Sequence, residues 1–324
     1  MFKVLSIDGG GIRGVIPAVL LEQLERDTGK PVSDLFDLVI GTSTGGILAA
    51  GLTVPKGNRK PKFGAEDMVA LYAERGREIF DRSFWDGVTS LGGIADEQYG
   101  AKPLEKLLRQ YLGDKTLTDC LQPVVITSYD IERREPYFFK SRRAADSQDR
   151  NHYLRDAARA TSAAPTYFEP EPVKSLARRP TRRVLIDGGV FVNNPALCGF
   201  VEAMAMGQKP EKILVASLGT GVATRKIPYE KAKDWGMVGW LRPILGVMMD
   251  GQADSADYQL RELLPDETTG DKQRYFRFDT ELDLALDDLD AANAGNIANL
   301  KAEAAQILAD QATEFERLVA LLKS

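Results

Sequence analysis

Ser43 is the residue whose surroundings most clearly indicate chemistry, because it lies in a Gly-x-Ser-x-Gly pattern formed by residues 41–45 (GTSTG). An apolar run, 37–40 (DLVI), precedes it, and a helical pattern, 44–52 (TGGILAAGL), follows it. A strand, a sharp turn and a helix in this order expose a serine hydroxyl at the carboxyl edge of a sheet. Ser43 is therefore a candidate nucleophile, with a tight turn needed only for packing as the alternative.

A serine nucleophile needs a base, and this chain of 324 residues contains one histidine, His152. His152 precedes a helical segment, a position typical of a surface or capping residue, so we do not expect it to be the base. Asp187 is a better candidate, because it ends the apolar run 183–187 (RVLID) and two glycines follow it. A carboxylate there could take the serine proton and return it to the leaving alcohol. Asp8 and Asp130 also end strand-like runs, so position alone does not choose among the three.

A second glycine-rich segment, 8–14 (DGGGIRG), lies between the first apolar run and the first helical pattern. Its backbone N–H groups could form an oxyanion hole, with Arg13 as a positive charge nearby. The segment also fits the dinucleotide pattern Gly-x-Gly-x-x-Gly, which would indicate a nucleotide-dependent oxidoreductase. That interpretation requires an acidic residue near the end of the second strand, whereas Asp37 stands before this strand. The oxidoreductase is therefore the weaker hypothesis.

The order of apolar runs and helical patterns predicts the fold that positions these residues. Their alternation favours an α/β fold, with a mostly parallel central sheet and helices on both faces. We expect one domain, 1–324, in which a catalytic core, 1–220, carries all the motifs and a mostly helical part, 221–324, packs on it. From about residue 290 the apolar spacing predicts one long helix. The expected strands are 3–7, 37–40, 123–130, 136–140, 183–187 and 212–218, and the expected helices are 15–27, 44–52, 65–80, 103–112 and 153–164.

Composition narrows the classes of function and location. The chain has 42 basic and 47 acidic residues and a net charge of −5, which argues against a nucleic acid polymer as partner. It has no run of eighteen apolar residues and no signal-peptide pattern, so we expect a cytoplasmic protein without a transmembrane helix. Cys120 and Cys198 cannot form a disulfide framework and are expected to be buried thiols. No histidine cluster or calcium-binding loop indicates a metal.

Several motifs together resemble one known family. The segments DGGGIRG (8–14), GTSTG (41–45) and DGG (187–189) occur in this order, with AARATSAAPTYFEP (157–170) before the last. The set resembles the patatin-like phospholipase family over most of residues 1–220. The resemblance implies a three-layer α/β fold related to cytosolic phospholipase A2.

The same resemblance assigns roles to residues of this chain. It implies a catalytic serine and aspartate without histidine, with Ser43 as nucleophile and Asp187 as base. No cofactor or metal takes part in such a scheme. The resemblance also implies an oxyanion hole formed by Gly10, Gly11, Arg13 and Thr44.

The family acts on acyl esters, chiefly phospholipids and galactolipids. The implied reaction is acyl transfer to water through an acyl-serine, on a membrane phospholipid or another acyl-ester lipid, with peripheral contact to the membrane. Some bacterial members of similar length are effectors activated by cyclic nucleotides in anti-phage defence, so an anionic small-molecule regulator is one alternative. A catalytically silent binding protein that keeps the fold is another. The oligomeric state is not predicted.

Three further segments have more than one interpretation. Segment 235–251 (WGMVGWLRPILGVMMDG) could line an acyl channel or touch a membrane, although we expect an ordinary core helix. Phe84 and Trp85 have the same two interpretations. The basic loop 174–183 is expected to be solvated, with contact to anionic headgroups or a regulator as the alternative. The residues concerned are Trp240, Leu241, Ile244, Leu245, Val247 and Met248 in the first segment and Lys174, Arg178, Arg179, Arg182 and Arg183 in the loop.

Overall fold

All six predicted strands are present in the protein, but the short strands at 55–57, 60–61 and 171–174 were not predicted. The computed structural model describes residues 1–80, 102–240, 243–264 and 273–324. Phe84 and Trp85 lie outside this range. The strands are β1 (Phe2–Ile7), β2 (Leu38–Gly41), β3 (Pro55–Gly57), β4 (Lys60–Pro61), β5 (Val124–Asp130), β6 (Glu135–Lys140), β7 (Glu171–Lys174), β8 (Arg182–Asp187), β9 (Ile213–Leu218) and β10 (Tyr275–Phe278).

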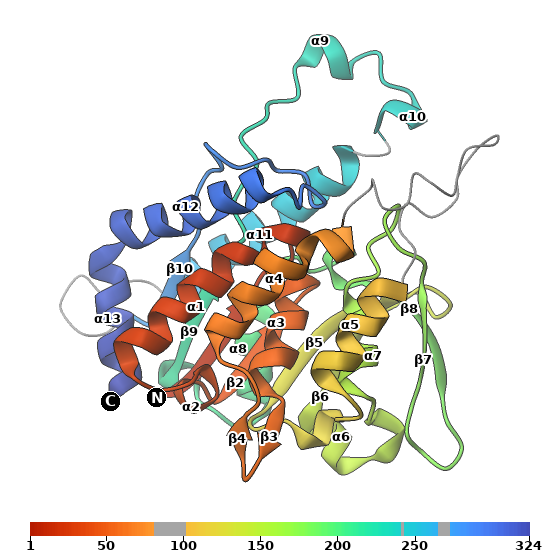
Figure 1. Ribbon diagram of the computed structural model, residues 1–324, viewed down its shortest axis with the longest axis vertical. Helices are drawn as coiled ribbons and strands as arrows, with labels where there is room; N and C mark the ends of the chain where they lie inside the picture. The colour runs from red at the N-terminus through yellow and green to blue at the C-terminus, as the bar shows by residue number, and fades with distance from the viewer. Residues whose placement is uncertain (81–101, 241–242, 265–272) are drawn as a thin grey trace.

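One mixed sheet forms the centre of the molecule (Figure 1). Its strands follow the order β10-β9-β1-β2-β5-β8-β7, with β6 also paired to β5. The neighbours from β10 to β5 pair in parallel, whereas β6 and β8 run antiparallel to β5, and β7 antiparallel to β8. The prediction of a mostly parallel sheet is confirmed.

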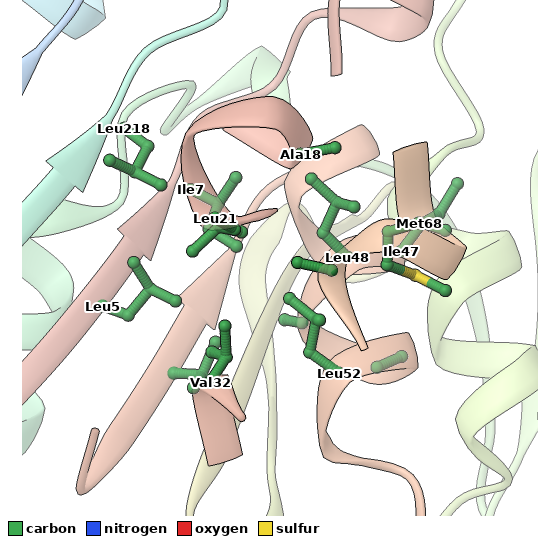
Figure 2. Close-up of a cluster of buried hydrophobic side chains, with 14 of the residues drawn as sticks. Leu5, Ile7, Ala18, Leu21, Val32, Ile47, Leu48, Leu52, Met68 and Leu218 are labelled. Carbon is green, nitrogen blue, oxygen red and sulfur yellow. The ribbon is translucent and has the colours of Figure 1, made fainter. Parts of the chain in front are cut away.

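Helices cover both faces of the sheet. Successive side chains of a strand point to opposite faces, so the buried strands present apolar side chains on both. In β1, Leu5 and Ile7 belong to one apolar cluster and Val4 to another on the opposite face. Figure 2 shows Leu5 and Ile7 near Leu21 of α1 and Leu48 of α3. The result is the expected three-layer arrangement. The first face carries α1 (Val15–Thr28), α3 (Thr44–Thr53), α4 (Ala65–Phe80), α5 (Lys102–Leu112), α7 (Leu154–Thr161) and α12 (Ala294–Asp310), and the second carries α8 (Ala196–Ala205) and α11 (Pro243–Leu263).

The remaining helices are short or lie at the periphery. Among the described helices, none is long and apolar enough to cross a bilayer. The short or peripheral helices are α2 (Val32–Leu35), α6 (Ser141–Asp146), α9 (Tyr229–Ala232), α10 (Met237–Trp240), α13 (Ala312–Lys323) and short 3-10 helices at Gly11–Gly14, Leu117–Asp119, Gln148–Arg150, Gly188–Val190 and Pro210–Lys212.

Cys120 and Cys198 are only partly buried, so the prediction of buried thiols is wrong.

The C-terminal part differs from its prediction in two ways. It supplies β10, which pairs in parallel with β9 and so extends the central sheet. The run YFRF is short and interrupted by Arg277, which explains why its strand was not predicted. The expected single helix is divided into α12 and α13, because Gln311 has non-helical angles of φ −112 and ψ 29. The apolar spacing continues across this break, since both helices pack on the same core.

Candidate active site

Ser43 occupies a sharp turn between β2 and α3. Its angles, φ 54 and ψ −122, are rarely adopted by residues other than glycine. The flanking glycines make the turn feasible, because a Cβ at Gly41 would lie 2.1 Å from the carbonyl oxygen of Gly45. A Cβ at Gly45 would lie 2.2 Å from the carbonyl oxygen of Ile7. The N–H of Ser43 donates to Thr161 Oγ1 at 2.8 Å, which holds the turn in place.

Asp187 lies beside this serine although 144 residues separate the two. The hydroxyl of Ser43 donates to Asp187 Oδ2 at 2.6 Å, and the N–H of Gly189 donates to Oδ1 at 2.7 Å. Gly188 permits a close approach between strands, since a Cβ there would lie 2.1 Å from Thr127 Oγ1. Ser43 is 9% exposed and Asp187 4%. The two side chains thus form a nearly enclosed pair at the carboxyl edge of the sheet.

Burial gives Asp187 an unusual affinity for a proton. Loss of hydration raises the pKa of its carboxyl to about 7, against the opposing effect of the hydrogen bonds from Ser43 and the Gly189 N–H. A carboxylate with a pKa near neutrality can both accept a proton from a hydroxyl and return it.

The two rival aspartates have different partners. Asp8 Oδ2 accepts from Arg277 at 2.7 Å, and Asp130 Oδ2 accepts from Arg183 at 2.9 Å. Burial raises the pKa of Asp8 to about 7 as well, so geometry rather than acidity separates the candidates. Of the three strand-end aspartates, Asp187 is the one that hydrogen-bonds the candidate nucleophile.

The glycine loop presents backbone donors next to Ser43. Gly11 and Thr44 line the same cavity as Ser43. Within the described residues no group accepts a hydrogen bond from the N–H of Gly10, Gly11 or Thr44. The Thr44 hydroxyl hydrogen-bonds the hydroxyl of Tyr72, so the backbone N–H of Thr44, at the start of α3, is the donor of this residue that remains available. Such donors suit an anion that develops on an ester carbonyl.

Arg13 hydrogen-bonds the backbone of the glycine loop. Its Nη1 donates to the carbonyl oxygen of Gly221 at 2.9 Å and its Nε to that of Gly10 at 3.4 Å. Its side chain is buried and does not line the cavity that contains Ser43. The structure thus places Arg13 where it fixes the glycine loop rather than where its guanidinium would meet a substrate.

Residues far along the chain also hold the glycine loop, and sequence patterns did not indicate them. Thr220 Oγ1 donates to the carbonyl oxygen of Gly9 at 2.7 Å, and the carbonyl oxygen of Leu289 accepts from the N–H of Ile12 at 2.9 Å. Arg277, on β10, pairs with Asp8 at the start of the loop. We call Thr220, Arg277 and Leu289 the C-terminal clamp.

An apolar cavity of about 150 Å³ opens at Ser43 and Asp187. Ile47 and Phe168 line it from the first face of the sheet, and Leu245 and Met249 line it from α11. The prediction of an ordinary core helix for this part of segment 235–251 is therefore wrong. This apolar run does form a helix, but its side chains border a cavity instead of packing in the core. Leu241 lies outside the described residues.

The dinucleotide hypothesis conflicts with the sheet geometry. Asp37 Oδ2 accepts from the N–H of Lys3 at 2.7 Å, near the start of β1. The glycine loop follows the opposite end of the same strand. An acid at the start of the strand cannot reach a ribose bound by glycines at its end.

A family model described as "Patatin-like phospholipase" matches residues 5–197, more than half of the chain. The chain belongs to the patatin-like phospholipase family. Membership implies a lipid acyl hydrolase. The matched residues include the strands, turns and helices that bring Ser43 and Asp187 together.

Patatin-like relatives extend the similarity beyond the matched residues. "Patatin-like protein 4" of Arabidopsis thaliana is 33% identical and aligns with 93% of this chain and 82% of its own. "Patatin-like protein 2" of Oryza sativa subsp. indica and "Patatin-15" of Solanum tuberosum are each 34% identical, over 80% of this chain and 72% of their own. The solved structure of VipD from Legionella pneumophila aligns with 95% of this chain and 67% of its own, at 13% identity and a TM-score of 0.46.

His152 of this patatin-like chain is a buried residue, so the prediction of a surface or capping position is wrong. It is 1% exposed, with Nε2 at 2.8 Å from the Tyr137 hydroxyl and Nδ1 at 3.2 Å from the carbonyl oxygen of Lys174. Burial lowers the pKa of the imidazole to about 4, so it is neutral near pH 7. It does not line the cavity that contains Ser43.

We expect His152→Gln to change kcat for a short-chain ester by less than about threefold, because the imidazole lies away from the reacting groups. Loss of its hydrogen bond to Tyr137 should lower the free energy of unfolding by about 1–3 kcal/mol. Steady-state kinetics on folded protein and thermal unfolding measure the two effects. A loss of kcat beyond about a thousandfold would instead make the imidazole the base.

The basic segment 174–183 joins β7 and β8 as a hairpin, and its charges are partly neutralised. Arg183 pairs with Asp130, and Arg182 pairs with Glu132 at 3.0 Å. Arg178 and Arg179 at the turn are exposed, as a solvated loop predicts. The described residues contain no group of three or more His, Cys, Asp or Glu placed to hold a metal.

Proposed function

We propose that this protein is a phospholipase A-type lipid acyl hydrolase that cleaves acyl esters through an acyl-serine at Ser43, with Asp187 as the base. The observation that carries this proposal is the 2.6 Å hydrogen bond from the serine hydroxyl to the buried carboxylate. The cavity at this bond is lined by apolar side chains, which suit an acyl chain.

The first half of the reaction forms the acyl-enzyme. Asp187 takes the hydroxyl proton while Ser43 Oγ bonds to the ester carbonyl carbon. The negative charge on the carbonyl oxygen is met by the N–H groups of Gly10, Gly11 and Thr44. When the tetrahedral intermediate collapses, the bond to the leaving alkoxide breaks and Asp187 returns the proton to it.

The second half regenerates the enzyme. Water gives a proton to the Asp187 carboxylate and bonds to the acyl carbon, and the ester bond to Ser43 Oγ then breaks. Asp187 returns the proton to Ser43, and the products are a fatty acid and an alcohol such as a lysophospholipid. In this scheme the substrate is a membrane phospholipid or a related acyl-ester lipid, reached in the cytoplasm at the membrane surface.

Incubation with phosphatidylcholine, followed by mass spectrometry of the products, tests this function. We expect fatty acid and lysophospholipid in equal amounts. The serine should also become labelled by a fluorophosphonate. A folded protein with neither ester turnover nor labelling of Ser43 would contradict the proposal and indicate a binding protein that keeps the fold.

The pH dependence of the reaction follows from Asp187. Because the base must be ionised and its pKa is about 7, we expect kcat/KM for a neutral short-chain ester to fall about tenfold per pH unit below pH 7 and to level off above it. Initial rates between about pH 5 and pH 9 measure the profile. A profile that stays flat down to pH 5 would contradict an Asp187 base with this pKa.

The same shift has the opposite effect on stability. An unfolded aspartate has a pKa of about 3.9, so between about pH 4 and pH 7 the folded state binds more protons at Asp187 than the unfolded state does. The contribution of Asp187 to the free energy of unfolding therefore decreases as the pH rises from about 4 to about 7. The loss of activity on the acidic side is thus not explained by unfolding through this group.

A further inference from the structure

Five large apolar side chains are exposed on two successive helices, α10 and α11, the second of which borders the cavity that contains Ser43. Met237 and Trp240 lie on α10, and Ile244, Val247 and Met248 lie on the first turns of α11. Met237 is 91% exposed, and the others are between 36% and 45% exposed. We call these five residues the apolar rim. Contiguous exposed apolar side chains in a soluble protein mark a site of contact with another molecule or surface.

The apolar rim is continuous with the cavity. Met248 is 44% exposed and also lines the cavity, while Leu245 and Met249 line it from the same turns of α11. Figure 1 shows α9 and α10 projecting from the body of the molecule near the start of α11, beyond the helices that cover the sheet. Met248 therefore belongs both to the rim and to the lining of the cavity that contains Ser43.

The charge of the adjoining segment differs from that of the whole chain. Residues 222–240 carry four basic and two acidic side chains, a net charge of +2, whereas the whole chain has −5. Lys226 and Lys231 form no ion pair within the described residues, and both are exposed. Exposed lysines in the segment that leads into the apolar rim complement an anionic lipid surface.

We propose that the apolar rim docks the protein on an anionic lipid bilayer, with the mouth of the cavity facing the membrane. The inference rests on the proposed function, because an acyl-ester lipid must leave a bilayer to enter the cavity. A bilayer fits better than a second copy of this chain, since five partly exposed side chains supply less than the roughly 800 Å² that each partner buries in a stable complex. A few apolar side chains with neighbouring cations are sufficient for reversible binding at a lipid surface.

The test uses the full chain carrying Ser43→Ala, so that the vesicles stay intact. Its binding to vesicles of phosphatidylcholine with about one third phosphatidylglycerol is measured by cosedimentation. We expect Ile244→Glu with Val247→Glu to weaken this binding at least about tenfold, because both exposed side chains then carry charge into the interface. Neither residue lines the cavity, so the same two changes in the protein with Ser43 should leave turnover of a soluble short-chain ester within about twofold.

Leu263→Glu is the matched control. Leu263 is 55% exposed on the same helix as Val247. At about 1.5 Å per residue it lies about 24 Å further along the helix axis than Val247. Since this side chain is away from the rim, the variant should bind vesicles as the unchanged protein does.

Equal vesicle binding by the rim and control variants would overturn the proposal. So would an absence of binding by the Ser43→Ala protein, or a dimer that dissociates in the rim variant, which would make the rim a contact between copies. Sedimentation velocity detects the dimer. Vesicle binding that depends on the rim, together with no turnover of any ester by the protein with Ser43, would support the docking surface while contradicting the proposed function.

Discussion

Ser43→Ala is expected to lower kcat for ester hydrolysis by about four to six orders of magnitude, because it removes the atom that forms the acyl-enzyme. The change deletes one hydroxyl from a nearly enclosed side chain and leaves the turn intact, since the bond between the Ser43 N–H and Thr161 involves the backbone. Burst and steady-state kinetics on a short-chain ester, with circular dichroism of the same sample, measure the effect.

Ser162→Ala is the matched control for this change. Ser162 lines the same cavity, but its hydroxyl donates to the carbonyl oxygen of Ala158 at 2.8 Å and not to a carboxylate. We expect fluorophosphonate labelling to persist in Ser162→Ala and to disappear in Ser43→Ala. Substantial turnover by a folded Ser43→Ala protein would exclude the acyl-serine mechanism.

Asp187→Asn is expected to lower kcat by roughly four orders of magnitude or more, about as much as Ser43→Ala, because the two residues act as one unit in the proposed reaction. The amide has the size of the carboxyl and can still contact Ser43, but it cannot accept the hydroxyl proton. The pH dependence below pH 7 should disappear from the residual rate, since the group that titrates at about pH 7 is gone. The measurement is a pH profile of kcat/KM at high enzyme concentration.

Asp130→Asn provides the comparison with another strand-end aspartate. It weakens the ion pairs with Arg133 and Arg183, so we expect a lower thermal midpoint but a kcat within about threefold of the unchanged enzyme. If this substitution, or Asp8→Asn, abolished turnover while Asp187→Asn reduced it only slightly, the base would be a different carboxylate from the one proposed.

The parts of the site that are local in sequence could be predicted from sequence. A side chain at Gly41 would meet the backbone of Gly45, a constraint within a few residues, whereas one at Gly45 would meet the backbone of Ile7 on the neighbouring strand β1. The pattern around Ser43 is nevertheless contiguous in the sequence and could be recognised there. The choice of Asp187 is different in kind. It depends on β8 running antiparallel to β5, which brings together residues 144 apart, and no spacing in the chain indicates that pairing. The family resemblance, rather than the residue pattern, selected it among three aspartates.

The fold was predicted best where the apolar runs were long and complete. β1 and β9 are buried along most of their length and flanked by clear turns, so their limits agree with the expectation to within a residue. β10 and the first turns of α11 were not predicted correctly, because a four-residue run with a charge inside it and an apolar helix beside a cavity have no distinctive pattern. Burial of His152 is likewise set by partners from distant segments.

The C-terminal clamp has a consequence for the synthesis of the protein. The glycine loop leaves the ribosome early, but Arg277 follows its partner Asp8 by 269 residues, and Leu289 follows later still. A growing chain can therefore already contain Ser43 and Asp187 while its loop lacks the contacts that fix the oxyanion donors. We therefore expect the proposed ester hydrolysis to begin only after Arg277 and Leu289 have emerged and folded against the glycine loop.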